Sequence, residues 1–119
     1  MNEPIWKYGE NIFPFDIDEY EDSVKYKSAV GVLAAAKLPE RMSDPAGFIK
    51  AYCAAIGAFF DHIFGDGTAE ILFEEKNNKR ICDDAYYSFL EFIAEQVQQS
   101  DARMLEAIKK YAPKKEVRT

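Results

Sequence analysis

The chain has 119 residues, with 21 acidic and 15 basic side chains and a net charge of −6. This length fits one domain, and an apolar share of 48% with a charged share of 30% is typical of a globular fold with a single core. An acidic surface repels phosphate groups, so the charge argues against duplex DNA or RNA as a partner.

The sequence predicts a cytoplasmic protein that makes no contact with a membrane. The first residues lack the basic and apolar blocks of a signal peptide, and no run approaches the ~18 uninterrupted apolar residues of a membrane span. Cys53 and Cys82 lack the spacing of a disulfide framework, which favours free buried thiols in a reducing compartment.

Residues 5–17, IWKYGENIFPFDI, predict a short N-terminal β-hairpin. Two β-favouring runs, the second over residues 12–17, flank a Gly-Glu-Asn turn. Pro14 cannot donate a backbone hydrogen bond, so it marks an edge position. An isolated hairpin is marginal in water, so its aromatic side chains either pack onto the helices or contact another chain. The candidate interface residues here are Trp6, Tyr8, Phe13 and Phe15.

Two helices are predicted next. The apolar spacing indicates the first over about residues 18–37, and Pro39 stops it because proline disfavours helix at the residue before it. The second covers residues 45–64, with a cap at Ser43 or Asp44 and proline at the first helical position. It has the widest apolar stripe, so we expect it to be the most buried helix.

A two-glycine turn follows the second helix. We expect Gly65 and Gly67 to have positive φ, with Gly65 as a left-handed helix terminator. A short helical segment then runs from residue 66 or 68 to Phe73. The residues that we expect in the core include Ile56, Phe59 and Phe89.

The last part of the chain predicts one long helix and a shorter one. The first begins at a cap on Asn77 or Asn78 and reaches about Gln99, and Ser100 is interpreted as the cap of a new helix. The expected fold is therefore mainly α, a three- to four-helix domain with a short N-terminal β-hairpin. It forms a single domain over residues 1–112. The apolar stripe of the last helix is Met104, Leu105, Ile108 and Tyr111.

Residues 113–119 are expected to form a basic flexible tail after Pro113. Five bases and one acid lie in residues 109–119. These side chains either solvate the end of the chain or contact an acidic partner. The candidate interface residues here are Lys109, Lys110, Lys114 and Lys115.

No set of residues points to catalysis, a metal or a cofactor, so we expect a protein that is not an enzyme. His62 is the only histidine, which leaves no partner for a zinc site or a nucleophile–base pair. The segment Gly65–Thr68 lacks the spacing and the Gly-Lys-Ser/Thr ending of a phosphate-binding loop. The acids that precede or begin the long helix suit its dipole. They are Glu74, Glu75, Asp83 and Asp84.

Three stretches carry a family resemblance. They are the opening IWKYGENIFPFDI, the middle segment FFDHIFGDGTAEILF, and NNKRICDDAYYSFLEFIAEQ. They resemble a family of small uncharacterised phage and prophage proteins of Gram-positive bacteria. The opening is also similar to the INGKxYxFDI-like start of tail assembly chaperones of long-tailed phages. Such chaperones are non-enzymatic, self-associate and coat the tape measure protein during tail assembly.

The resemblance implies a phage or prophage tail-assembly protein in the host-cell cytoplasm. It would be a chaperone that shields a tape measure protein, and we expect it to form a homo-oligomer. The alternative is a host-directed regulator or inhibitor that binds a host protein through its acidic face. A gene position between tail tube and tape measure genes favours the first, and a position among early control genes favours the second.

Overall fold

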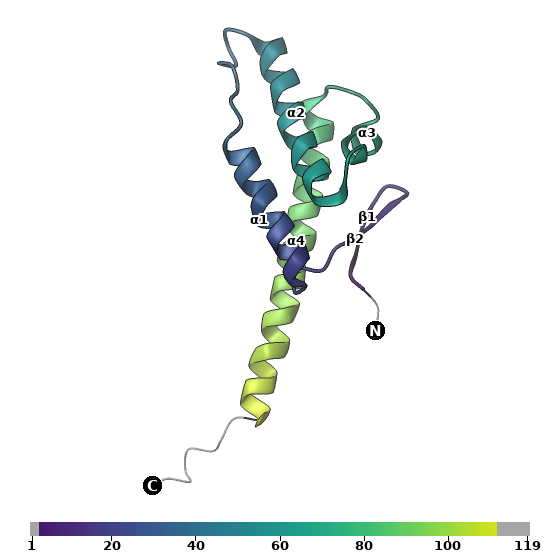
Figure 1. Cartoon of the computed structure of the whole chain (residues 1–119), viewed down its shortest axis with the longest axis vertical. Helices are drawn as coiled ribbons and strands as arrows, with labels where there is room; N and C mark the ends of the chain where they lie inside the picture. Colours follow the sequence, from purple (N-terminus) through teal and green to yellow (C-terminus); the bar gives the residue numbers. More distant parts are fainter. Residues whose placement is uncertain (1–2, 112–119) are drawn as a thin grey trace.

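The computed structural model describes residues 3–111 and shows a mainly α fold with an N-terminal hairpin, as predicted. Helices α1, α2 and α4 lie side by side, α3 is a short connection, and the hairpin lies against one flank of the helices (Figure 1). The elements are β1 (Ile5–Tyr8), β2 (Asn11–Pro14), α1 (Tyr20–Ala34), α2 (Pro45–Phe64), α3 (Thr68–Phe73) and α4 (Lys79–Tyr111).

Helix α4 is the longest element and extends well beyond the others (Figure 1). Its 33 residues span about 50 Å at 1.5 Å per residue, and they account for most of the 69 Å length of the molecule. The prediction of a new helix at Ser100 is wrong. No glycine or proline lies between Lys79 and Tyr111, so nothing interrupts the backbone hydrogen bonds there.

The core is a cluster of aromatic rings at the level where the hairpin, α2 and α4 meet. Phe89 of α4 is fully buried, and its ring centroid lies 5.1 Å from Trp6, 5.4 Å from Phe15 and 5.7 Å from Phe60. Ile56, Phe59 and Phe89 are all buried, which confirms the predicted core. Ring-to-ring packing in edge-to-face geometry therefore dominates the contacts that hold the elements together.

The hairpin has the predicted antiparallel pairing, with Trp6 opposite Phe13 and Tyr8 opposite Asn11. Pro14 faces Ile5, a position whose backbone groups point away from the paired strand, so its missing N–H removes no ladder bond. The second strand is shorter than predicted. It ends at Pro14, because the residues that follow turn toward α1.

The bounds of α2 are those predicted from the sequence. The Asp44 carboxylate accepts a 3.0 Å hydrogen bond from the backbone N–H of Gly47, and Pro45 occupies the first helical position. By length and hydropathy alone α2 could cross a membrane, although the core helix of a globular domain passes the same test. Here its apolar face packs against the other helices.

Helix α1 ends three residues earlier than predicted, at Ala34 instead of Lys37. Every residue from 34 to 46 is exposed. Tertiary packing supplies most of the stability of a short helix, so a last turn that buries nothing gains little from staying helical.

The turn between α2 and α3 needs both of its glycines. Gly67 has the left-handed helical conformation, with φ 94° and ψ −10°. Gly65 also has positive φ, as predicted, but its ψ of 160° lies outside the left-handed helical region that we expected. That combination is open almost exclusively to glycine. The Asp61 carboxylate then accepts a 2.8 Å hydrogen bond from Ala69 N–H and fixes the start of α3.

Replacing Gly65 with valine should lower the free energy of unfolding by about 1–3 kcal/mol, as measured by urea denaturation. A Cβ at Gly65 would meet no atom within 4 Å, so the loss would come from the backbone alone. Gly31→Ala is the matched control, because Gly31 lies in the exposed interior of α1 with equally open space. That change should raise stability by about 0.5–1 kcal/mol. Equal stability of Gly65→Val and the wild type would contradict the assigned turn.

Candidate protein-binding surfaces

The hairpin aromatics do not form the exposed surface that the sequence allowed. Trp6 and Phe15 are 2% and 1% exposed, and their partners belong to the same chain. The Trp6 indole stacks parallel to the Phe60 ring at 5.5 Å and donates a 3.0 Å hydrogen bond to the Ser88 hydroxyl. The prediction that these two residues belong to an interface is therefore corrected, because both lie in the core of their own chain.

Tyr8 and Phe13, the other two hairpin candidates, are half-buried against the same cluster. Ile5 and Ile12 point the opposite way and are 44% and 57% exposed. The sequence left open whether the aromatic face packs onto the helices or contacts another chain, and the structure packs it onto the helices and leaves the aliphatic face outside. A strand pattern gives two faces but does not say which one meets the core.

An exposed apolar surface lies on the part of α4 that projects past the bundle, Val97–Tyr111, which we call the α4 arm (Figure 1). No residue from 101 to 111 is buried. Val97, Met104, Ile108 and Tyr111 are 39%, 54%, 53% and 75% exposed and recur at helical spacing. We call these four residues the arm stripe. They continue along the arm the face by which Phe89 and Ile93 enter the core. Leu105, which the sequence pattern placed in the stripe, lies 100° around the helix from Met104 and is not part of it.

The sequence located the apolar residues of the arm but did not show that the arm projects past the other helices. The length of the last helix was the sequence signal that could have indicated this projection. A helix without a break from Asn78 to Tyr111 is far longer than α2, so its end has no helix to pack against. Exposed apolar residues at regular spacing on such a projection are typical of a surface that another molecule covers.

The base of the arm is tied to the segment that joins the hairpin to α1. The Gln96 side chain accepts a 2.8 Å hydrogen bond from Ile17 N–H and donates a 2.9 Å bond to the Phe15 carbonyl. The Asp18 carboxylate accepts a 3.0 Å bond from the Ser100 hydroxyl and lies 3.4 Å from the Arg103 guanidinium. These contacts fix the direction in which the arm leaves the bundle.

The acids before α1 are largely occupied with their own backbone. Asp22 accepts a 2.9 Å hydrogen bond from Asp16 N–H, and Asp16 accepts one of the same length from Asp18 N–H. This arrangement turns the chain from the hairpin into the helix. Glu19 and Glu21 are exposed beside it and give this end of α1 its negative surface.

The basic candidates lie at the far end of the arm. Lys109 and Lys110 are exposed in its last turn, where positive charge suits the helix dipole. The Lys110 ammonium lies 5.4 Å from the centroid of the Tyr111 ring. Lys114 and Lys115, and the expected tail of residues 113–119, lie outside the described residues.

One polar cluster links α2 to the start of α4. Asp83 accepts hydrogen bonds from the Tyr52 hydroxyl and, at 2.8 Å, from the Lys79 ammonium. Burial alone would raise the pKa of Asp83, but the bonds from Lys79 and Tyr52 outweigh it and hold that pKa below its usual value. Burial, followed by the bond to Asp83, raises the pKa of Tyr52. The cluster resembles a structural ion pair rather than a proton-transfer site, and the nearby positive charge of Arg41 also lowers the pKa of Asp83.

Asp83→Asn should lower stability by about 1 kcal/mol at neutral pH, because the charged acceptor of two hydrogen bonds is lost. A lowered pKa stabilises the fold above the usual carboxyl range and loses that effect as pH falls through it. The difference between wild type and Asp83→Asn in urea titrations should therefore be constant above about pH 5 and shrink below about pH 4. Asp84→Asn, on the exposed neighbour, should change stability by less than about 0.5 kcal/mol. A pH-independent difference would contradict this interpretation.

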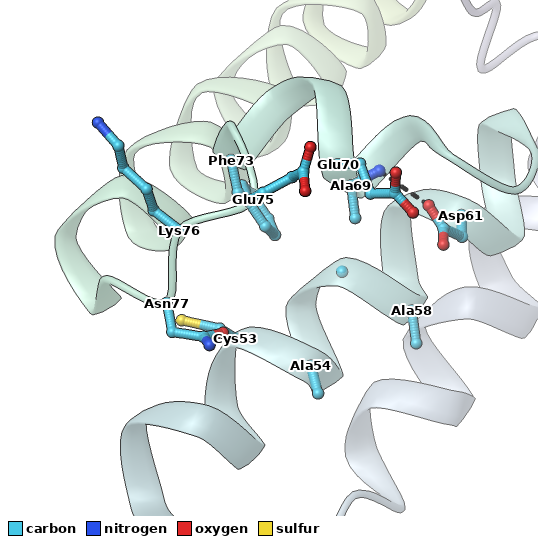
Figure 2. A pocket seen from close by; sticks show the side chains of 11 residues that line it. Cys53, Ala54, Ala58, Asp61, Ala69, Glu70, Phe73, Glu75, Lys76 and Asn77 are labelled. Atoms are coloured by element: carbon cyan, nitrogen blue, oxygen red, sulfur yellow. Dashed lines mark hydrogen bonds between the residues drawn. The ribbon is translucent and has the colours of Figure 1, made fainter. Parts of the chain in front are cut away.

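A shallow groove of about 430 Å³ lies between α2, α3 and the loop that follows (Figure 2). Small side chains of α2 and α3 form its floor, and Figure 2 shows Lys76 pointing away from it. Gly57 leaves room for the close approach of α3, since a Cβ there would lie 3.0 Å from that of Ala69. The acids Glu70 and Glu75 lie at its edge, the buried thiol of Cys53 is also among its lining residues, and none of the lining residues is a histidine.

The remaining residues with possible chemistry have structural surroundings. His62 is exposed and lies 2.8 Å from the Ser28 hydroxyl, so it joins α2 to α1. Cys53 and Cys82 are both buried, and burial together with a hydrogen bond from the Cys82 thiol to Cys53 raises the pKa of Cys82 to about 12. Within residues 3–111, no three His, Cys, Asp or Glu side chains are grouped to hold a metal ion.

These features define a helical domain with an N-terminal hairpin and a projecting amphipathic arm. The chain belongs to DUF6673, a family of unknown function, whose model matches residues 9–119. The match takes in β2, all four helices and the arm. No curated protein and no solved structure matches the chain.

Proposed function

We propose that this protein is a non-enzymatic phage or prophage tail-assembly chaperone that shields apolar segments of a tape measure protein in the host-cell cytoplasm. The observation that supports this function best is the α4 arm. It presents four apolar side chains to solvent at the spacing by which helices recognise one another. The resemblance of the hairpin opening to tail assembly chaperones gives the class of client.

The chemistry of the arm suits a client that is long and variable in sequence. Met104 is unbranched and polarisable, so it adapts to differently shaped apolar partners. Tyr111 offers a wide ring with a polar end, which stays compatible with water when no client is bound. The arm also stands clear of the bundle, so a client helix could lie along it without displacing any core residue (Figure 1).

The test is co-expression with the tape measure protein encoded in the same genome. We expect the chaperone to raise the soluble fraction of the tape measure protein and to co-purify with it. The double variant Met104→Glu/Ile108→Glu should lose both effects, because it places two charges on the arm stripe. Tyr87→Glu, which changes an exposed α4 residue away from the arm, should keep them. A tape measure protein that is equally soluble with and without the chaperone would refute the proposal.

The alternative function, a host-directed regulator that acts through an acidic face, stays a prediction. Two acids before α1, Asp16 and Asp18, and Asp22 in its first turn accept hydrogen bonds from within the chain, which reduces the charge available to a partner. Gene order separates the two functions, since a tail chaperone gene lies beside the tape measure gene and a regulator gene lies among early control genes.

A further inference from the structure

The spacing of the arm stripe allows two copies of it to pack against each other in an antiparallel arrangement. Val97 and Tyr111 each lie seven residues from Met104, one before it and one after it. If two arms run antiparallel with their Met104 residues opposite each other, Val97 of one arm lies opposite Tyr111 of the second copy. The same register places the small Ser100 opposite the bulky Ile108. Large residues thus meet smaller ones along the contact, as close helix packing requires.

The charges of the arm favour the same direction. Its base is acidic, with Glu95 and Asp101 on the helix and Asp18 packed beside it, whereas its end carries Lys109 and Lys110. An antiparallel pair places the basic end of each arm on the acidic base of the other. A parallel pair would place like charges together at both ends, which is unfavourable.

One contact can be specified further. Arg103 lies seven residues before Lys110, on the same side of the helix, and its guanidinium contacts Asp18. In a two-fold antiparallel pair, like sides of the two helices face each other. Lys110 therefore reaches the Asp18 of the second copy, whose side chain is 50% exposed. Lys109 lies 100° away around the helix, on the flank of the stripe opposite to Arg103 and Asp18.

We propose that the protein forms an antiparallel homodimer through its α4 arms, centred on Met104, with Lys110 of each copy near Asp18 of the other. The overlap of two arms is about 22 Å long at 1.5 Å per residue, so the contact belongs to the small, dissociable class of interfaces. The dimer is inferred for the protein without a client and does not rest on the proposed function.

Sedimentation velocity over the micromolar range tests the dimer. We expect a monomer–dimer equilibrium for the wild type and a monomer at every concentration for Met104→Glu/Ile108→Glu. Leu105→Glu is the matched control: it adds a charge to an equally exposed arm residue that lies off the stripe, and it should dimerise nearly as well as the wild type. Circular dichroism should show that all variants are folded. A wild type that stays monomeric throughout overturns the proposal.

The electrostatic contact has its own matched pair of variants. Lys110→Glu and Lys109→Glu change the net charge equally, but only Lys110 lies on the flank of the helix where Asp18 of the second copy is expected. Lys110→Glu should raise the dimer Kd about tenfold, and Lys109→Glu should raise it much less. An equal effect of the two variants would contradict the assigned register.

Disulfide trapping tests the direction of the arms. Val97→Cys and Tyr111→Cys chains, mixed and treated with oxidised glutathione, should link to each other, because the two positions lie opposite in the antiparallel pair. Either variant alone should link to itself far more slowly. Cys53 and Cys82 are buried, so they add little background. Rapid linking of Val97→Cys to itself would indicate a parallel pair and overturn the proposal.

Discussion

Replacing Phe89 with alanine should lower the free energy of unfolding by about 3–5 kcal/mol, the usual loss for a buried aromatic ring. Phe89 is fully buried and lies within 6.0 Å, centroid to centroid, of rings from the hairpin and from α2. Its removal leaves a cavity at the point where those elements meet. Since domains of this size are stable by only about 5–15 kcal/mol, the variant should be close to unfolding.

The measurement is urea denaturation followed by circular dichroism, with Tyr87→Ala as the control. Tyr87 lies two residues earlier on the same helix but is 53% exposed, so its loss should change stability by less than about 1 kcal/mol. Phe89→Leu should fall between the two, because it restores part of the lost volume. A Phe89→Ala variant as stable as Tyr87→Ala would show that the aromatic cluster does not join the elements as described.

Replacing Trp6 with alanine should lower stability by a comparable amount, about 3–5 kcal/mol, and should also release the hairpin from the helices. Trp6 contributes the largest ring of the hairpin to the core and its only side-chain hydrogen bond to α4 among the described residues. A two-stranded hairpin does not persist alone in water. Amide hydrogen exchange in residues 5–14 should therefore accelerate more than exchange in α2.

Two milder variants separate the ring from its hydrogen bond. Trp6→Phe keeps an aromatic ring near Phe60 but loses the bond to Ser88, whereas Ser88→Ala keeps the indole and leaves its N–H without that acceptor. Each should lower stability by about 1–3 kcal/mol. Uniform acceleration of exchange across hairpin and helices in Trp6→Ala would mean that the hairpin unfolds only with the whole domain.

The elements that could be predicted from the sequence are those with local signals at their ends. Helix α2 begins at an aspartate cap followed by proline and ends at a glycine, so both of its bounds were correct. The predicted end of α1 and the predicted length of α4 were wrong, because both depend on what each helix packs against. Ser100 has the chemistry of a cap, yet its hydroxyl bonds to Asp18, which lies 82 residues away in sequence.

The candidate surfaces likewise combine features that could be predicted from local sequence with features that depend on tertiary packing. The alternation of the hairpin residues identified two faces but could not show that Trp6 and Phe15 fill the core of their own chain. The spacing of the apolar residues of the arm identified them in the sequence, but it could not show that they are exposed. Exposure depends on the three-dimensional arrangement, here on a bundle whose other helices end before α4 does (Figure 1).

The projection of the α4 arm has a thermodynamic consequence of its own. A helical segment of about 15 residues that buries no side chain is only marginally stable in water, and no residue of the arm is buried; its contacts with Asp18 reach only as far as Arg103. Its end should therefore fray in the isolated monomer, and any molecule that covers it also selects its ordered form. Part of the interaction free energy then goes into folding the last turns, which weakens the association and keeps it reversible. The helical content of the solution thus becomes a direct optical measure of how much of the arm is occupied.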